Sequence, residues 1–367
     1  MIAIPVYLSL VLITLIVIFY FERKVPAFIQ DRLGPMEAGK YGIIQALADV
    51  LKLIQKEDIV PTAADRVLFL AAPFVIFLAV FAGFAVLPLN ATFIGSSLYA
   101  GVFFIMTIIS IDVIGLLMAG WGSNSKFSLF GAMRSVAQII SYEIPFGISV
   151  LCVVVIAQSL DLQEISYQQG IWINNYKEGS QEINYLFGLK ALGINVTGVG
   201  GILTWNIVRM PFLFIAYVIF FIATLAECNR APFDLPEAES EIVGGYHTEY
   251  SGFRFAIFFL AEYGMMLLVS LLGAVLFLGS WNTPFPNIGG LRLAEWTTGE
   301  PGTLSNYIWG SFWVISKAFI AMLLQVWVRW TYPRLRVDQL MHLCWKVLTP
   351  FGLFLLLLCC IWRLLMI

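Results

Sequence analysis

The chain has 367 residues, of which 60% are hydrophobic and 12% are charged, and its formal net charge is −2. A soluble domain carries about 25% charged residues, so this composition excludes a soluble globular protein. A net charge near zero also gives no reason to expect a nucleic-acid partner.

Eight apolar runs are long enough to cross a membrane, because a bilayer core of roughly 30 Å needs about 20 apolar residues per helix. We therefore predict an all-α polytopic membrane protein with about eight transmembrane helices, in which residues 1–367 form a single integral membrane domain. The spans are expected near 1–22, 66–88, 98–120, 131–158, 206–227, 253–279, 306–330 and 341–363.

The first run is expected to be a retained helix, not a cleaved signal peptide. It is long, it lacks a basic start and it ends in Glu22, Arg23 and Lys24. Cytoplasmic loops carry an excess of Lys and Arg, and with the N terminus outside, 15 of the 21 basic residues fall on the cytoplasmic side. We expect an integral protein of the bacterial inner (cytoplasmic) membrane, with the matrix side of an organelle as the equivalent alternative.

The segment that follows the first span is too polar to cross the membrane and too regular to be a plain loop. Residues 41–56 are predicted to form an interfacial amphipathic helix on the cytoplasmic side, as one apolar face indicates. That face consists of Ile43, Ile44, Leu47, Val50, Leu51 and Ile54. A short helix packed on a soluble partner is the alternative.

A polar stretch at 227–252 lies between two apolar runs and is predicted to be a cytoplasmic acidic loop. Only Arg230 and Arg254 offset its charge, so its repulsion must be relieved by protonation, hydrogen bonding or another protein. Pro232 and Pro236 restrict the backbone and favour a rigid loop over a solvated acidic one. Its carboxylates, six of the chain's 23, are Glu227, Asp234, Glu237, Glu239, Glu241 and Glu249.

Charged residues also lie inside predicted spans. Glu143 and Glu262 fall near mid-bilayer depth, and Asp112 and Lys317 lie within other spans. A carboxylate at the bilayer centre costs about 2.5 kcal/mol or more, so such groups face a protein interior or a water path. Satisfied structural hydrogen bonding is the alternative for each of them alone, whereas several in one bundle favour a proton path.

The sequence offers no redox centre. Its five cysteines have no CxxC spacing, and His247 and His342 lie near loop edges, where they do not suit a membrane haem. We therefore expect no metal and no cofactor bound by this chain. The long loop 159–205, predicted on the outer face, gives no chemical signal.

Five stretches together resemble one known family: ERKVPAFIQDRLGP, GWGSNSKFSLFGAMRSVAQIISYE, AECNRAPFDLPEAESEIVGGYHTEYSG, FFLAEY and PRLRVDQLM. They are similar to the H subunits of the proton-pumping NADH:quinone oxidoreductases, respiratory complex I. The resemblance implies a membrane-arm subunit that closes the quinone chamber with soluble subunits of the peripheral arm. Small membrane subunits, antiporter-like subunits and membrane lipid would be its other partners. The quinone (ubiquinone or menaquinone) would be shared with those partners, which would hold the iron–sulfur clusters, FMN and NADH.

The resemblance also implies roles for particular residues. Glu143, Glu227 and Glu262 would form a chain of buried acids, with Arg134 supporting Glu143. The acidic loop at its mouth would contribute Asp234, Glu237, Glu239, Glu241 and Glu249. The quinone-binding region would include Glu22, Arg23, Phe28, Asp31, Arg32, Asp49 and Glu57.

The chain also departs from the family at two places. Residues 36–40 depart from the family's usual sequence, and Asp112 matches no expected acid, so it is a candidate addition to the path. The membrane anchor of an energy-converting hydrogenase and an autonomous ion transporter are the alternative functions. The segment PFDLPEAESE favours the quinone enzyme over the hydrogenase anchor, and the large cytoplasmic acidic loop, which has no nucleotide or substrate motif, argues against an autonomous transporter.

Overall fold

The computed structural model describes residues 3–173, 185–188, 195–235, 243–288 and 291–365. Within these ranges the chain is helical and has no β-strand, only two isolated bridges, Tyr185 with Asn195 and Ile288 with Leu291. The longer helices are α1 (Ala3–Ile29), α2 (Gln45–Gln55), α3 (Arg66–Phe84), α4 (Gly101–Gly122), α5 (Lys126–Ala157), α9 (Leu213–Glu227), α11 (Gly252–Leu276), α13 (Leu304–Thr331) and α15 (Thr349–Leu365).

Short helical segments connect the longer ones. The α-helical ones are α6 (Leu162–Gln168), α7 (Val196–Val199), α8 (Asn206–Arg209), α12 (Leu293–Thr298) and α14 (Val337–His342). The 3₁₀ segments are η1 (Lys40–Gly42), η4 (Leu186–Gly188), η6 (Gly201–Thr204) and η7 (Gly245–His247), and η8 (Leu343–Leu348) is a π-helical segment between α14 and α15.

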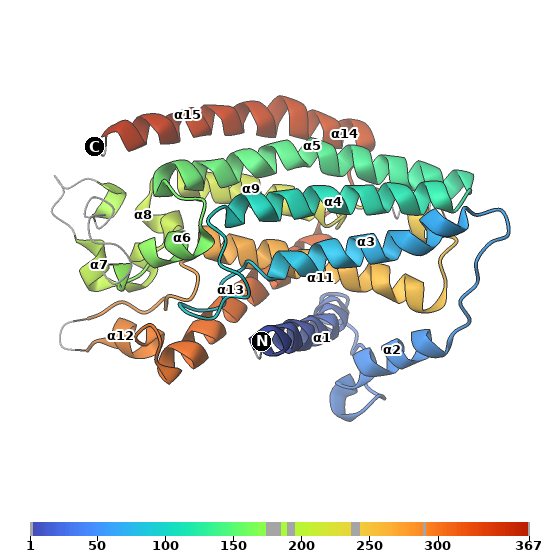
Figure 1. Cartoon of the computed structure of the whole chain (residues 1–367), viewed down its shortest axis with the longest axis horizontal. Helices are drawn as coiled ribbons and strands as arrows, with labels where there is room; N and C mark the ends of the chain where they lie inside the picture. Colours follow the sequence, from blue (N-terminus) through green and yellow to red (C-terminus); the bar gives the residue numbers. More distant parts are fainter. Residues whose placement is uncertain (1–2, 174–184, 189–194, 236–242, 289–290, 366–367) are drawn as a thin grey trace.

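The long helices form one bundle (Figure 1). α3, α4, α5, α9, α11 and α15 run side by side along the long axis of the molecule, and α13 crosses them at an angle. Packing joins α3 to α4 and α11, α5 to α4, α9 and α15, and α13 to α1 and α11. Six helices in the described part of the chain are long and apolar enough to span a membrane, and α9 is a shorter apolar helix. The prediction of an all-α polytopic membrane protein is confirmed.

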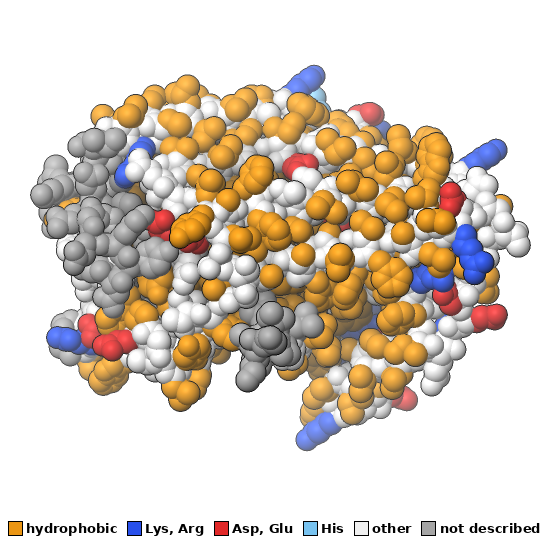
Figure 2. All heavy atoms as spheres, in the orientation of Figure 1, with side chains coloured by type: hydrophobic (Ala, Val, Ile, Leu, Met, Phe, Trp, Pro, Cys, Tyr) orange, Lys and Arg blue, Asp and Glu red, His pale blue; other side chains and the backbone are white. Residues whose placement is uncertain are grey.

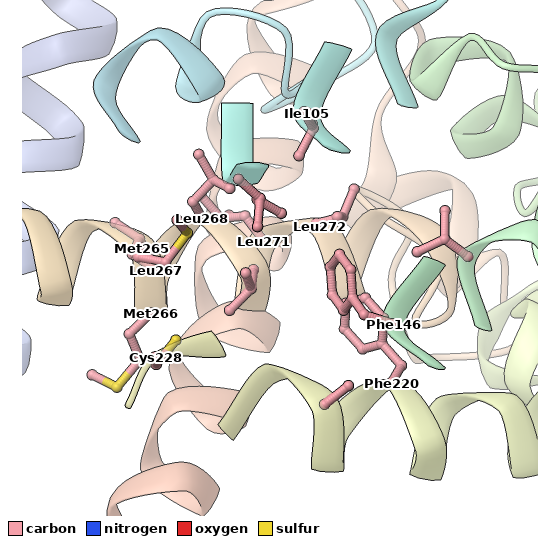
Figure 3. Packing of buried hydrophobic residues seen from close by; sticks show 14 of the residues in the cluster. Ile105, Phe146, Phe220, Cys228, Met265, Met266, Leu267, Leu268, Leu271 and Leu272 are labelled. Atoms are coloured by element: carbon pink, nitrogen blue, oxygen red, sulfur yellow. The ribbon is translucent and has the colours of Figure 1, made fainter. Parts of the chain in front are cut away.

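The core of the bundle is built around α11. The most apolar stretch of α11 has 72% of its residues buried, against 22% for the run 337–365, which places α11 at the centre and α15 at the edge. Figure 3 shows how its side chains meet those of the surrounding helices. Leu268, Leu271 and Leu272 pack near Ile105 of α4 and Phe220 of α9, and all five side chains are buried.

The connections gather at the two ends of the bundle (Figure 1). One end, which we call the α2 end, carries residues 30–65, the α4–α5 turn at 123–125 and the described parts of 228–251. The opposite end, the α6 end, carries α6, α7, α8 and α12. In the face shown in Figure 2, hydrophobic side chains cover most of the length between these ends, and most charged groups lie towards the ends.

Two of the expected span boundaries are wrong. The span expected at 206–227 is divided, because α8 ends at Arg209 and α9 begins only at Leu213. Pro211 disfavours helix at the residue before it, and Met210 is accordingly extended, with φ −111° and ψ 130°. The first span was expected to end near residue 22, but α1 continues to Ile29 through Pro26.

The amphipathic helix expected at 41–56 is shorter than predicted. α2 begins at Gln45, because Tyr41 and Gly42 have positive φ angles of 60° and 78° and interrupt the helix. Its apolar face is uncovered, since Leu47, Leu51 and the other predicted face residues are exposed. The segment expected as a long loop at 159–205 contains α6, η4, α7 and η6 in its described parts.

Candidate functional site

A buried charge cluster joins three distant parts of the chain near the α2 end of the bundle. Glu22 of α1 accepts a hydrogen bond from Arg230 Nη1 at 3.0 Å and is also paired with Arg329 of α13. Glu22 and Arg230 are 8% and 7% exposed, so the pair is shielded from water. The Arg230 guanidinium lies 4.4 Å from the ring centroid of Tyr263 on α11. These contacts tie α1, α11 and α13 to the segment that follows α9.

The charge on Arg230 is firmly held. Burial by itself would lower the pKa of its guanidinium, but the carboxylate of Glu22, with Tyr263 and Glu262 nearby, raises that pKa well above its ordinary value. Arg230 therefore acts as a fixed positive charge. Truncating one partner of such a buried pair leaves an uncompensated charge, which costs about 3–5 kcal/mol.

Arg230 is positioned by the way the chain leaves α9. The Gln138 amide of α5 donates hydrogen bonds to the carbonyl of Ala226 at 2.8 Å and to Asn229 Oδ1 at 3.3 Å. Asn229 itself adopts a left-handed φ of 47°, which Asn tolerates better than most residues. The Arg230 amide then donates to the carbonyl of Leu225 at 3.1 Å. The end of α9 is thus fastened to α5.

A second group of polar side chains surrounds Glu262 on α11. Its Oε1 accepts a hydrogen bond from the Tyr246 hydroxyl at 2.7 Å and lies 3.3 Å from Nε2 of His247. Both partners belong to η7, which Ser128 of α5 holds by donating to the carbonyl of Tyr246 at 3.3 Å. Glu262 therefore sits among polar partners that stabilise its charge.

The third group surrounds Glu227 at the end of α9. Glu227 is 2% exposed, and among the described residues neither of its carboxylate oxygens has a hydrogen-bond partner. Asp112 of α4 is buried as well, and its Oδ1 likewise has no partner in the described part of the chain. Glu143 of α5 is half-buried and accepts a hydrogen bond from Ser110 of α4.

Asp112, Glu227 and Glu262 line one small cavity. Its volume is about 20 Å³, which is enough for one water molecule. Asn229 and Tyr246 add polar atoms to its wall, and the remainder is mostly apolar. Three acidic residues, one each from α4, α9 and α11, thus border a common space inside the bundle.

The predicted quinone-binding residues divide into two sets. Arg23 Nη2 pairs with Asp49 Oδ2 at 2.5 Å, which ties α1 to α2 beside the buried Glu22. Lys24, which is also buried, holds the turn after α1 by donating to the carbonyls of Leu33 and Pro35 at 3.1 and 2.7 Å. The structure does not draw the second set into this cluster, since Phe28, Asp31, Arg32 and Glu57 are exposed.

The acidic loop is described only in part. Asp234 is 5% exposed and is paired with Arg334 at 2.8 Å, while Glu249 is half-buried. Arg134, expected to support Glu143, lies 5.5 Å from the ring centroid of Phe130, and its supporting role stays a prediction. The predicted residues Glu237, Glu239 and Glu241 lie outside the described residues.

Several site residues escaped the sequence reasoning. The sequence patterns indicate Arg230 only as a loop charge and do not single out Arg329, although a carboxylate at the end of an apolar helix, as Glu22 is, indicates the need for a buried cation. His247 was considered only as a haem ligand, and Tyr246 carried no signal of its own. In the ranges that the structure describes, no three His, Cys, Asp or Glu side chains are grouped so that they could hold a metal ion.

Fold and site together define an integral membrane protein whose interior holds a row of carboxylates, some firmly paired and some not. The family model described as NADH dehydrogenase matches residues 2–360. The chain belongs to this family. Its relatives include the second NADH-quinone oxidoreductase H subunit of Cytophaga hutchinsonii, which is 60% identical over 356 residues, 97% of this chain and 96% of that protein.

Two further relatives extend the comparison, and both are named as H subunits of NADH-quinone oxidoreductase. The protein of Chlorobium luteolum is 52% identical over 344 residues, 94% of this chain and 83% of that protein. The protein of Bacteroides thetaiotaomicron is 42% identical over 355 residues, 96% of this chain and 88% of that protein. The resemblance noted in the sequence is confirmed.

Proposed function

We propose that this chain forms part of a quinone-binding chamber and couples quinone reduction to proton translocation through its buried carboxylates. The family and its relatives make the chain a membrane subunit of an NADH-quinone oxidoreductase. The single observation that carries the coupling is the contrast between Glu262, which has hydrogen-bonding partners, and Glu227, which has none among the described residues.

That contrast suits proton transfer. A charge is stabilised at Glu262 by Tyr246 and His247, whereas burial without partners favours a proton on Glu227. Two carboxylates at one low-dielectric site titrate as a coupled pair, so a change of charge nearby moves protons between them. In this proposal the charge change comes from reduction of a quinone beside the cluster of Glu22, Arg230 and Arg329.

Packed apolar side chains of α1 and α13 adjoin that cluster. Phe21 of α1 faces Phe319 and Met322 of α13 there, and Glu22 lies at their edge. Sites for apolar ligands with a polar head combine such walls with a few convergent polar groups. In this proposal the quinone head would lie near Arg23 and Asp49.

The partners, cofactors and orientation belong to the same proposal. Peripheral-arm subunits would complete the quinone chamber and hold the iron–sulfur clusters, FMN and NADH, and small and antiporter-like membrane subunits would continue the proton path. The N terminus would lie outside and the acidic loop at 227–252 on the cytoplasmic side. α2 would lie flat in the membrane interface, which its uncovered apolar face favours.

Replacing Glu227 or Glu262 by Gln in the assembled complex tests the coupling. Gln keeps the shape of the side chain but cannot ionise, so quinone reduction and proton pumping in inverted vesicles should fall together, by at least about tenfold. Electron transfer from NADH to an artificial acceptor should stay normal. The exposed Glu300, replaced by Gln, is the matched control. Wild-type rates in both interior variants, with normal assembly on a native gel, would contradict the proposal.

A further inference from the structure

Lys317 and Arg209 are buried cations near the α6 end of the bundle, and the proposed path uses neither of them. Lys317 of α13 is 5% exposed and Arg209 of α8 is 1% exposed. Neither is paired with an acid among the described residues, since their partners there are backbone carbonyls, an amide side chain and an aromatic ring. A buried cation without an acidic partner is costly in a membrane protein, so by default it indicates a function.

The contacts of Lys317 match its charged form. Its Nζ donates to the carbonyls of Ser280 and Asn282 at 2.7 and 2.5 Å, just beyond the end of α11 at Leu276. It also lies 4.2 Å from the ring centroid of Trp205. These contacts occupy all the N–H donors of an ammonium group, and an aromatic face attracts a cation. A neutral amine would instead turn its lone pair towards one of these electron-rich groups.

Arg209 adds a second positive charge at the same end. Its Nη1 donates to the carbonyl of Gln168 at 2.6 Å, where α6 ends, and its Nη2 donates to Asn206 Oδ1 at 3.1 Å. A guanidinium stays protonated in proteins, so this charge is permanent. Trp205, which Lys317 contacts, directly precedes the short helix α8 that ends in Arg209. One segment of the chain thus meets both cations.

α11 is dry between the buried acids and these cations. All of residues 263–276 are buried, and Tyr263 and Ser270 alone among them carry polar side chains. The stretch spans about 14 residues, or roughly 21 Å along the helix axis. Phe146 and Phe220 of the neighbouring helices pack close to it (Figure 3). We call residues 263–276 with these neighbours the apolar layer. Because it is closely packed and has few polar groups to bind water, it offers a proton no chain of water molecules.

We propose that Lys317 and Arg209, together with the apolar layer, form a barrier that keeps protons from leaving the row of carboxylates through the α6 end of this chain. The inference rests on the proposed proton path and sets where that path ends. A proton that reaches Glu227 or Glu262 must then leave sideways, into a neighbouring membrane subunit.

Electrostatics gives the barrier its selectivity. Membrane pores exclude protons and other cations with a fixed Arg or with the positive ends of helices. A unit charge about 10 Å away, at an effective dielectric constant of about 20, lowers the local proton population on the order of tenfold. Two such charges in one place therefore oppose a proton even when a water molecule enters the apolar layer.

The test removes each charge in the assembled complex, reconstituted in proteoliposomes. Lys317→Met keeps the length of the side chain and loses the charge, and the carbonyls that it leaves free can bind water. Arg209→Gln keeps an amide that can donate to the carbonyl of Gln168. With NADH absent, an imposed pH gradient should decay roughly threefold to tenfold faster in either variant. NADH-driven quinone reduction should stay close to the wild-type rate, while fewer protons are pumped for each quinone reduced.

Two further variants separate lost charge from lost packing. Lys317→Arg keeps the charge and should be as proton-tight as the wild type. Asn306→Leu is the matched control, because Asn306 is also buried on α13 and its neutral amide donates to the carbonyls of Thr298 and Gly299. It should lower thermal stability without opening a leak. A leak in Asn306→Leu as fast as that in Lys317→Met would make packing the cause and overturn the inference.

The remaining outcomes distinguish the barrier from the path. A wild-type rate of decay in assembled Lys317→Met and Arg209→Gln overturns the barrier and leaves the proposed path standing, because this leak is measured without turnover. If neither neutral variant assembles, the charges serve assembly and the barrier is overturned as well. Normal quinone reduction and pumping in Glu227→Gln and Glu262→Gln would instead remove the path itself, and the barrier would have nothing to close.

Discussion

Arg230 is the single residue on which the charge balance near the α2 end of the bundle most depends. It offsets Glu22 in a site where both side chains are more than nine-tenths buried, and it stacks on Tyr263. A buried ion pair adds little net stability compared with apolar side chains of the same size, but it is costly to break from one side. Removing one partner of the pair should therefore destabilise the protein more than removing both partners.

Arg230→Gln should sharply reduce the amount of assembled complex, because Arg329 is then the one counter-charge left to Glu22 among the described residues. The expected loss is about 3–5 kcal/mol for a single truncation of a buried pair. Adding Glu22→Gln should recover part of it, since both charges are then gone. Assembly on native gels and thermal inactivation measure the effect.

The control for this prediction is the exposed pair of Arg292 and Glu295, at 3.3 Å with side chains 72% and 36% exposed. Such pairs contribute about 0–1 kcal/mol, so Arg292→Gln should have little effect. If the double variant at Arg230 and Glu22 is as damaged as the single one, pairing is not what Arg230 contributes.

At the scale of elements, the close approach of α5 to η7 positions the partners of Glu262. Gly131 of α5 lies so near to this turn that a Cβ added to it would stand 2.7 Å from the Cα of Gly245 and 3.0 Å from the amide nitrogen of Tyr246. Those are backbone atoms, which cannot rotate away as a side chain does. The glycine thus sets where Tyr246 and His247 lie.

Gly131→Ala should therefore push η7 away from α5 and weaken the hydrogen bonds to Glu262. Overpacking of this kind costs about 1–3 kcal/mol, and quinone reduction should fall several-fold while electron transfer to an artificial acceptor persists. Gly147→Ala on the same helix is the control, because its Cβ would meet only Met106 Cε, at an ordinary 3.5 Å. Equal activity of the two variants would show that this contact does not position the site.

Sequence patterns predict the helix boundaries well where the length of an apolar run sets them. They predict the boundaries less well where the backbone preference of a single residue sets them. The long apolar runs became α3, α4, α11 and α13 within a few residues of the expected ends. The break before α9 follows from Pro211, whose effect on Met210 the hydropathy pattern does not register.

The sequence predicts the buried acids of the site but not the side chains that pair with them. Depth along a helix identifies Glu143 and Glu262 as costly to bury, and this follows from sequence position alone. Which cation or phenol reaches them depends on contacts across the bundle, such as Arg230 with Glu22, which are 208 residues apart. No periodicity in the sequence specifies such a pairing.

At the scale of the whole molecule, the two ends of the bundle differ in charge. The α2 end carries most of the basic residues outside the spans, among them Arg32, Lys40, Lys52 and Lys56. The α6 end carries few, such as Arg292. Because positive charge is retained on the cytoplasmic side during insertion, this asymmetry predicts that the α2 end faces the cytoplasm. The cluster of Glu22, Arg230 and Arg329 and the acidic loop at 227–252 would then contact the soluble subunits directly.

Cysteines placed at the two ends test this orientation. Glu37→Cys at the α2 end and Glu300→Cys at the α6 end replace exposed residues, in a Cys360→Ser background that removes the exposed native thiol. A membrane-impermeant maleimide should label residue 300 in right-side-out vesicles. Residue 37 should react only in inverted vesicles from which the soluble subunits have been removed. Labelling of both in detergent verifies that both thiols are reactive. The reverse pattern would place the cluster of Glu22 and Arg230 on the outer side, away from any cytoplasmic electron donor, and the proposed coupling would fail with the orientation.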